Sequence, residues 1–315
     1  DHEADTRETI NRAVRLLQSG EVVALPTETV YGLGADALDP NAVEKIFQAK
    51  ERPHFDPLIV HLPHKTSFHE VADVPDALKK PLIPDIVTAG LPTVAVRMCD
   101  HPVFHRIIKN FGNPIAAPSA NRFGCLSPTS AKAVLSQLEG KIPLIVDGGA
   151  CGRGLESTIV KLIADEPKNR IEIVRPGPIT EDDLKKFGKI SFAEKNTEVE
   201  ESAPEAPGLL ANHYAPRTPL RLLSSPEEFR AEPGKRYALL SYRGQEKDGY
   251  VQLHDWDEVS VLSPGSGRVA EAGVRFFHVL WQLDQLGVDE IIAEPVPNRS
   301  VGKAILEKLR KAAVK

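Results

Sequence analysis

A stretch from residue 192 to residue 219, FAEKNTEVEESAPEAPGLLANHYAPRTP, divides this 315-residue chain into two parts. It is rich in proline and glutamate and has neither helical nor strand periodicity, which is typical of a linker. On both sides of it, short apolar runs are mixed with amphipathic stretches, as in α/β proteins. We therefore predict a larger domain over residues 1–190, a linker over 191–218 and a smaller domain over 219–315.

The larger predicted domain mixes strands and helices without strict alternation, which indicates an α/β fold with a partly mixed sheet. Thr6 is expected to cap a first helix, and Asp39, followed by Pro40, to begin a second one. Further helices are predicted over residues 129–138 and 180–187. Buried strands are predicted over residues 21–27, 57–62, 93–98, 114–119, 142–149, 157–163 and 171–177.

The smaller predicted domain has a succession of strands and helices that indicates a small Rossmann-like parallel α/β fold. Its strands are apolar and short, and its helices carry an apolar stripe. The expected strands cover residues 237–242, 259–262 and 288–296, and the expected helices cover 267–286 and 300–313.

Composition limits the classes of protein to which the chain can belong. Its hydrophobic content of 41% suffices for a buried core, and its formal net charge of −5 argues against a protein that mainly binds phosphate backbones. Three cysteines without metal-type spacing argue against a disulfide framework or a zinc site. The first residues are polar, and no apolar run reaches the ~18 residues of a membrane span. We expect a soluble, cytoplasmic protein.

Gly32, Gly34 and Ala37 fit the G-x-G-x-x-A pattern of dinucleotide-binding loops. In that fingerprint the glycines open a helix, and an acidic residue follows about 20 residues later. Here the helix signal at Asp39 comes several residues too late, and the next predicted strand ends in His61. The context therefore disfavours an NAD-dependent oxidoreductase, and the two glycines are interpreted as parts of a tight turn.

Other catalytic motifs are missing from the sequence. Without a G-x-S-x-G elbow, Ser119 is not expected to be a hydrolase nucleophile. Without G-x-x-x-x-G-K-[ST], the chain is not expected to be a P-loop enzyme. The glycine-rich SPGSG at 263–267 is interpreted as a plain turn rather than an anion site.

Hydroxyl and cationic side chains recur beside the predicted strands, where open α/β sheets bind ligands. A buried arginine without a partner is costly, so a cluster of such groups predicts an anionic ligand with phosphates, a carboxylate or both. Alternatively, each cation could pair with one of the 44 acidic residues, and Lys50 and Arg52 could favour the dipole of their helix. The residues concerned are Thr27, Thr29, Tyr31, Lys50, Arg52, His61, Arg97, Ser119, Asn121, Ser157, Thr158 and Arg175.

Several segments, in order and over nearly the whole chain, resemble the threonylcarbamoyl-AMP synthase family. They are PTETVYGLGADA, KIFQAKERP, PLIVHL, TVAVR, APSAN, GLESTIV, VRPG and HYAP. The resemblance is to the YrdC-like catalytic domain of that family and to the C-terminal domain of its long form. It implies a YrdC-like catalytic domain with a twisted mixed sheet over 1–190, followed by the small Rossmann-like domain.

The resemblance also implies an activity, that of a nucleotidyltransferase. Such an enzyme makes threonylcarbamoyl-AMP and pyrophosphate from L-threonine, bicarbonate and ATP, with Mg2+ accompanying the ATP. A separate tRNA threonylcarbamoyl-transfer complex would use the product to form N6-threonylcarbamoyladenosine at position 37 of tRNA. No metal ligand from protein side chains and no membrane partner is implied, and direct tRNA binding is left open.

Two alternatives to this activity are considered. One is an RNA-binding YrdC-like protein without adenylating activity, which the net negative charge disfavours. The other is a related enzyme that acts on carbamoyl phosphate, which normally carries zinc-finger motifs. Three cysteines are too few for those motifs.

The family's site residues carry over by position. Its K-x-R and S-x-N signature, taken as catalytic, appears here as Lys50, Arg52, Ser119 and Asn121. The ATP side comprises these four with Thr93, Ser127, Arg175 and Tyr214, and the threonine side comprises Thr27, Tyr31, His61, Arg97, the backbone at Ala117, and Ser157. The guanidinium of Arg97 can hold a carboxylate as a fork, and Lys50 and Arg52 can neutralise a triphosphate.

One departure from the family lies between Lys80 and Pro84, where a segment resembling F-x-PGPLT is expected. The sequence runs DALKKPLIPDIVTAG instead. Either the chain lacks this element, which flanks the active site in the family, or the printed sequence omits a loop. The second interpretation is preferred because mobile loops at active sites are common.

Overall fold

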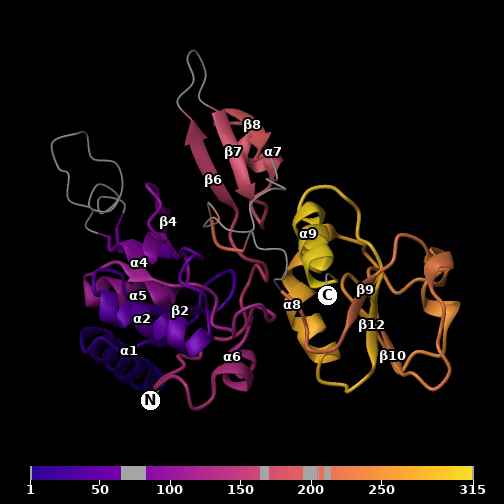
Figure 1. Ribbon diagram of the computed structural model, residues 1–315, viewed down its shortest axis with the longest axis horizontal. Helices are drawn as coiled ribbons and strands as arrows, with labels where there is room; N and C mark the ends of the chain where they lie inside the picture. The colour runs from indigo at the N-terminus through magenta and orange to yellow at the C-terminus, as the bar shows by residue number, and fades with distance from the viewer. Residues whose placement is uncertain are drawn as a thin grey trace. The chain divides into compact units, whose positions relative to one another are not determined.

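The computed structural model describes residues 2–64, 83–163, 170–193, 204, 206–208 and 214–313 (Figure 1). These residues form two compact units, and each is described by itself. The first unit holds the described residues among 1–123, 128–151 and 195–209, and the second holds those among 124–127, 152–194 and 210–315. Residues 80–82, where the family segment was expected, lie outside the described residues, and the predicted domain bounds stay a prediction.

Five short strands form a mixed sheet in the first unit, which confirms the predicted α/β fold with a mixed sheet. They are β1 (Val23–Leu25), β2 (Gly32–Asp36), β3 (Ile59–His61), β4 (Ala95–Arg97) and β5 (Ile115–Ala116). Their order is β1-β2-β5-β3-β4, with β3 and β4 parallel and every other neighbouring pair antiparallel.

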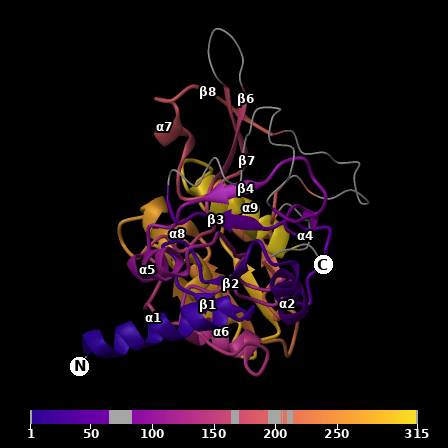
Figure 2. The same ribbon diagram turned by 90° about the vertical axis from the view of Figure 1, so that its left-hand side faces the viewer.

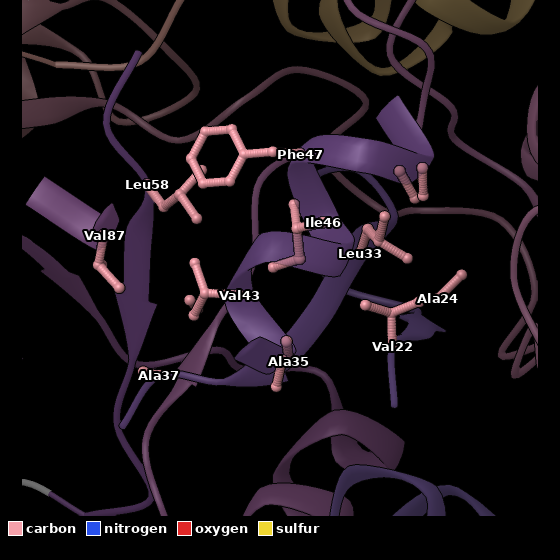
Figure 3. Close-up of a cluster of buried hydrophobic side chains, with 14 of the residues drawn as sticks. Val22, Ala24, Leu33, Ala35, Ala37, Val43, Ile46, Phe47, Leu58 and Val87 are labelled. Atoms are coloured by element: carbon pink, nitrogen blue, oxygen red, sulfur yellow. The ribbon is translucent and has the colours of Figure 1, made fainter. Parts of the chain in front are cut away.

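Two apolar cores flank this sheet because successive residues of a strand point to opposite faces. Val22 and Ala24 belong to one core, and Val23 and Leu25 belong to the other. The first core also contains side chains of α2 (Pro40–Lys50) and α4 (Asp85–Thr88) (Figure 3). The second contains side chains of α1 (His2–Gln18) and α5 (Pro102–Phe111), and Figure 2 shows α1 running from the N-terminus along this unit. A further helix of the unit, α6 (Ala131–Leu138), begins after its N-cap Ser130.

The helix α2 shows how local sequence fixes an element that the site needs. Asp39 accepts a hydrogen bond from the backbone N–H of Asn41 at 2.9 Å, and Pro40 occupies the first turn, as predicted. Val43, Ile46 and Phe47 recur at helical spacing and point into the first core (Figure 3). The helix therefore has a fixed rotation, and its last residue, Lys50, is directed inward, where it is 1% exposed.

The second unit contains two separate sheets. In one, β6 (Ile159–Ile163) pairs antiparallel with β7 (Arg170–Arg175), which pairs parallel with β8 (Lys189–Phe192). The other is entirely parallel, in the order β11-β10-β12-β9. Its strands are β9 (Leu220–Leu222), β10 (Tyr237–Ser241), β11 (Glu258–Val261) and β12 (Glu290–Ala293). The all-parallel order confirms the predicted small Rossmann-like sheet.

Helices complete the second unit (Figure 1). α7 (Glu181–Leu184) starts at a capping box formed by Thr180 and Asp183, so the predicted cap is confirmed. α8 (Val269–Leu283) and α9 (Gly302–Ala312) pack against each other and against strands of the parallel sheet. Short 3-10 helices are η2 (Pro226–Glu228), η3 (Glu246–Asp248) and η4 (Val251–Leu253).

Several predicted elements need correction. Thr6 does not cap the first helix, because α1 already begins at His2. Residues 142–149 form no strand: Ile145 makes an isolated bridge to Ala24, and the run then reaches Gly148 and Gly149, a residue type that weakens strands. Gly32 and Gly34 lie within β2 rather than in a tight turn, and a Cβ at Gly34 would come within 2.9 Å of Ile115. The elements β2, α4, α5, β8 and β9 were not predicted.

Candidate functional site

Lys50 anchors the loop that follows β5. Its ammonium donates hydrogen bonds to the carbonyl oxygens of Ser119 and Asn121, the latter at 2.6 Å. The backbone N–H of Ala120 donates to the carbonyl of Tyr31 at 2.8 Å, and Ser119 makes a bridge to Gly32. The two signature segments, K-x-R and S-x-N, are therefore brought together by a buried cation, as their joint assignment to one site requires.

Arg52 is buried and is balanced by an acid that follows it closely in the sequence. Its guanidinium lies 2.9 Å from the carboxylate of Asp56, and both side chains are nearly inaccessible to solvent. It also donates to the carbonyl oxygen of Pro57 at 2.8 Å. Because these contacts hold the turn between α2 and β3, Arg52 fixes the approach to that strand.

Arg97, at the end of β4, meets the hydroxyl-rich segment after β1. Its guanidinium forms an ion pair with Glu28 and donates to the hydroxyl of Thr29 at 2.9 Å. Glu28 also accepts hydrogen bonds from the thiol of Cys99 and the backbone N–H of Asp100. Burial alone would raise the pKa of Glu28, but the charge of Arg97 and these hydrogen bonds lower it to about 2.

These pairs correct one premise of the sequence argument, that the cations beside the strands lack partners. Arg52 has Asp56 and Arg97 has Glu28. Both acids were overlooked, although Asp56 stands four residues after Arg52 and Glu28 lies inside the quoted segment PTETV. The alternative that each cation pairs with an acid is the one that the geometry supports for Arg52 and Arg97.

His61 is buried at the end of β3, beside the ring of Phe104 at a centroid distance of 4.7 Å. Burial lowers the pKa of His61 to about 3, and the nearby positive charge of Arg97 contributes in the same direction. The imidazole is therefore neutral at physiological pH. A neutral ring can donate or accept a hydrogen bond, but with this pKa it is a weak general base.

Three further residues predicted for the threonine side are buried close to these groups. The Thr27 hydroxyl contacts the Thr29 hydroxyl at 2.9 Å, and the backbone N–H of Ala117 donates to Ile59 at 2.9 Å. The Tyr31 hydroxyl donates to the carbonyl of Gly149 at 2.7 Å and accepts from the N–H of Gly148 at 3.1 Å. Tyr31 thus holds the glycine turn after residue 146, and burial raises its pKa. Thr93, predicted for the ATP side, is exposed just before β4.

The other predicted residues belong to the second unit. Arg175, at the end of β7, is buried and donates to both the carbonyl and the hydroxyl of Ser157, at 2.9 and 3.1 Å. Ser127 donates to the carboxylate of Glu156. Tyr214, 1% exposed, adopts a left-handed backbone with φ of 66° and packs against Phe277. Hydrogen bonds and ring packing within the second unit therefore hold Arg175, Ser157, Ser127 and Tyr214.

Comparisons with known proteins agree with this arrangement. Residues 15–177 match the family model described as "Telomere recombination", and residues 179–314 match the model "Threonylcarbamoyl-AMP synthase, C-terminal domain". The threonylcarbamoyl-AMP synthase of Bacillus subtilis (strain 168) is 38% identical, over 96% of this chain and 92% of the relative. That of Pyrococcus abyssi is 35% identical, over 96% and 94%.

The chain belongs to the threonylcarbamoyl-AMP synthase family. A solved structure of this family, "Crystal structure of P. abyssi Sua5 complexed with L-threonine", superposes with a TM-score of 0.82 and 34% identity. The match covers 96% of this chain and 94% of that one. The predicted resemblance, fold class and enzyme class are therefore confirmed: this member of the threonylcarbamoyl-AMP synthase family is a nucleotidyltransferase.

Among residues whose placement is described, no group of three or more His, Cys, Asp or Glu side chains is arranged to hold a metal ion. Within the same part of the chain, every helix is too short or too polar to cross a membrane. The predicted cytoplasmic location stays a prediction.

Proposed function

We propose that this protein is an L-threonylcarbamoyladenylate synthase. It converts L-threonine, bicarbonate and ATP into threonylcarbamoyl-AMP and pyrophosphate, and the product serves the modification of adenosine 37 in tRNA. The observation that carries the proposal is the match, over 96% of the chain, to a solved relative whose title names L-threonine as its ligand. The cationic and hydroxyl side chains described above can bind the carboxylate of threonine and the phosphates of ATP.

L-Threonine brings a carboxylate, an amine and a hydroxyl to the site. Arg97 and Thr29 lie together where the segment after β1 meets the end of β4. The guanidinium is the group on this side of the sheet that can take a carboxylate bidentately, while keeping its pair with Glu28. The pKa of His61 is lowered by burial and by the charge of Arg97, so its ring is neutral and is suited to a hydrogen bond with the threonine hydroxyl.

ATP would be bound by the loop that carries Ser119 and Asn121. The ammonium of Lys50 donates hydrogen bonds to two carbonyl oxygens of this loop, so its positive charge lies in contact with the loop backbone. A cation in this dry position stabilises negative charge that develops on the leaving pyrophosphate. Thr93, Ser127, Arg175 and Tyr214, which the family resemblance assigns to the ATP side, are proposed as further ATP-binding residues.

The proposed reaction proceeds by two bond-forming steps without a covalent enzyme intermediate. The threonine amine attacks bicarbonate, and loss of water gives a carbamate. A carbamate oxygen then attacks the α-phosphorus of ATP, and the bond to the departing pyrophosphate breaks. The protein contributes chiefly by holding the reactants in contact and by balancing charge. Mg2+ would enter with ATP, held by phosphate oxygens and water, and would supply further charge neutralisation.

Pyrophosphate release is the direct test of this function. The full-length protein is incubated with ATP and Mg2+, and L-threonine and bicarbonate are each supplied or withheld. We expect release only when both are present. Pyrophosphate release at the same rate when threonine or bicarbonate is withheld would contradict the proposal. A folded protein that releases no pyrophosphate but shifts RNA in a salt-sensitive manner would favour the RNA-binding alternative.

A further inference from the structure

A buried ion pair joins two distant segments of the second unit. The ammonium of Lys308, on α9, lies 3.4 Å from the carboxylate of Glu156, in the turn before β6. The two side chains are 1% and 7% exposed. Neither residue has been assigned a role in the site so far. A buried lysine demands an explanation because the removal of its charge from water is costly.

Each partner of this pair also touches a residue proposed for the ATP side. The second oxygen of the Glu156 carboxylate accepts the hydrogen bond of the Ser127 hydroxyl. The ammonium of Lys308 lies 4.9 Å from the centroid of the Tyr214 ring, within the range of a cation–π contact. Lys308 is thus connected to Ser127 through Glu156 and to Tyr214 directly.

The backbone ties the same two residues together. The N–H of Ala215 donates to the carbonyl of Gly124 at 2.8 Å, and Cys125 forms a parallel bridge with Ala215. The segment that carries Ser127 therefore runs beside the segment that carries Tyr214. The Tyr214 ring also rests on Phe277 of α8, with centroids 5.7 Å apart. Lys308, on α9, contacts the segment of Tyr214 directly and is connected to the segment of Ser127 through Glu156.

The surroundings of Lys308 act on the free energy of its charged form in opposite directions. Burial lowers the pKa of Lys308, and the positive charges of Arg175 and Lys311 act in the same direction. The carboxylates of Glu156 and Glu307 act against this and favour the ammonium form. A well-packed apolar pair of similar size would stabilise the fold equally well or better than a buried ion pair. Stability alone therefore does not account for a lysine here.

We propose that Lys308 is a positioning residue for ATP binding. Its ammonium orients the Glu156 carboxylate, which in turn fixes the hydroxyl of Ser127, and it packs on the ring of Tyr214. Helix α9 of the C-terminal region thereby sets the geometry of two residues on the ATP side. The inference rests on the proposed function, because that function assigns Ser127 and Tyr214 to ATP.

If Lys308 positions ATP-binding residues, its loss should affect the KM for ATP and the KM for threonine differently. A purely structural role would not produce such a difference. Of the residues predicted for the threonine side, Arg97, His61 and Thr27 belong to the first unit, and none of their described contacts involves Lys308. Ser157, the predicted threonine-side residue of the second unit, is held by hydrogen bonds from Arg175. Loss of Lys308 should therefore weaken ATP binding and leave the threonine dependence nearly unchanged. General destabilisation would lower activity without changing either KM of the folded fraction.

The experiment uses the full-length protein with Lys308→Met and a matched control. The control is Lys303→Met, on the same helix, which removes an ion pair with Glu181 at 2.9 Å and a cation–π contact with Phe192. For each variant, the KM for ATP, the KM for threonine and the melting temperature are measured, and the Kd for ATP is measured without turnover. Lys308→Arg, which keeps the charge, tests rescue.

For Lys308→Met we expect a KM and a Kd for ATP at least ~10-fold higher, as for the loss of one hydrogen bond to a charged group. The KM for threonine should change less than about two-fold, and Lys303→Met should bind ATP like the wild type. Lys308→Arg should recover part of the ATP affinity. An ATP affinity of Lys308→Met equal to that of Lys303→Met would overturn the inference.

Two arms keep the outcome interpretable. If Lys308→Met does not fold, the double variant Glu156→Gln with Lys308→Met removes both charges, and it should fold while still binding ATP weakly. Wild-type ATP affinity in that folded double variant would also overturn the inference. If the wild type releases no threonine-dependent pyrophosphate, the proposed function fails, whereas the Kd for ATP still tests the role of Lys308.

Discussion

At the scale of single residues, the cations beside the strands of the first unit have partners within the protein. Lys50 donates to two carbonyl oxygens, Arg52 pairs with Asp56, and Arg97 pairs with Glu28. Such pairs hold the charged groups in one geometry, so little reorganisation is needed when an anionic substrate binds. Under the proposed function, the substrate would share Arg97 with Glu28, the partner that already holds it.

Substitution of Arg97 tests this view of the threonine side. Arg97→Ala removes the guanidinium proposed to hold the substrate carboxylate, so we expect the KM for threonine to rise about 10- to 100-fold, with little change in the KM for ATP. Arg122→Ala, which removes an exposed pair with Glu51, is the control. An unchanged threonine dependence in Arg97→Ala would remove this residue from the site. The double variant with Glu28→Gln checks that an unpaired buried carboxylate is not the cause.

The low pKa of His61 predicts a stability effect of definite sign. The folded protein keeps this ring neutral down to about pH 3, whereas the unfolded chain binds a proton near pH 6.5. Between these pH values the unfolded state thus binds more protons than the folded state. The free energy of unfolding is therefore highest, as far as His61 is concerned, above pH 6.5, and it decreases as the pH falls below 6.5. At 1.36 kcal/mol per unit, His61 should lower the free energy of unfolding by about 1.5–2 kcal/mol between pH 6.5 and 5.

Denaturant unfolding of the wild type and of His61→Gln at both pH values measures this effect. The wild type should lose more stability than the variant over this interval, by about the amount given by the linkage relation. Equal losses in the two proteins would mean that the ring takes up a proton in the folded state. Glu28, with its pKa of about 2, contributes a loss of its own only below its ordinary pKa of 4.5.

At the scale of elements, close backbone contacts in the second unit depend on glycine. A Cβ on Gly177, just after β7, would come within 2.4 Å of the carbonyl oxygen of Glu156 and 2.5 Å of the N–H of Thr158. Both contacts are with backbone, which cannot move aside as a flexible side chain does. This glycine therefore lets the end of β7, with Arg175, lie against the segment that carries Glu156 and Ser157.

Gly177→Ala should accordingly destabilise the protein by about 1–3 kcal/mol, the range for overpacking of a tight site. Gly152→Ala is the matched control in the same unit, because a Cβ there meets nothing within 4 Å and the backbone is not left-handed. Thermal or denaturant unfolding of both variants provides the comparison. If the two variants were equally stable, the close approach around Gly177 would be of no energetic consequence.

At the scale of the whole molecule, residues 152–193 share a unit with the C-terminal region. Gly154 approaches α8 so closely that a Cβ would lie 2.1 Å from the carbonyl oxygen of Val274. Leu155 is completely buried and would lie 3.3 Å from a Cβ on Gly273 of the same helix. A cut after β8 would therefore remove the surface on which the segment around Leu155 packs.

A fragment ending at residue 193 provides the test of this arrangement. We expect the amides of residues 152–157 to exchange with solvent much faster in the fragment than in the full-length chain, because their packing partner is missing. Amides of α2 and β2 belong to the first unit and should keep their protection, which makes them the internal control. Equal protection of residues 152–157 in both proteins would show that this segment folds without α8.

The sequence alone determined much of the local structure and the identity of the signature residues. Asp39 with Pro40 specified the start of α2, Thr180 specified that of α7, and β-branched runs specified β3, β6 and β7, because caps and side-chain periodicity act over a few residues. The segments PTETV, K-x-R and S-x-N were recognisable because they resemble those of a known family. The interpretations of Thr6, of the run over 142–149 and of Gly32 with Gly34 were wrong.

Only the tertiary structure decided which charges meet. Lys50 finds the carbonyls of residues 119 and 121, Arg97 finds Glu28, and Lys308 finds Glu156. These partners are far apart in the chain, and the energy of a charge pair depends on burial and distance rather than on sequence spacing. For that reason the sequence could name candidate residues for the site, whereas the fold determined their partners, the shifts of their pKa values and the ion pair that joins helix α9 to Glu156.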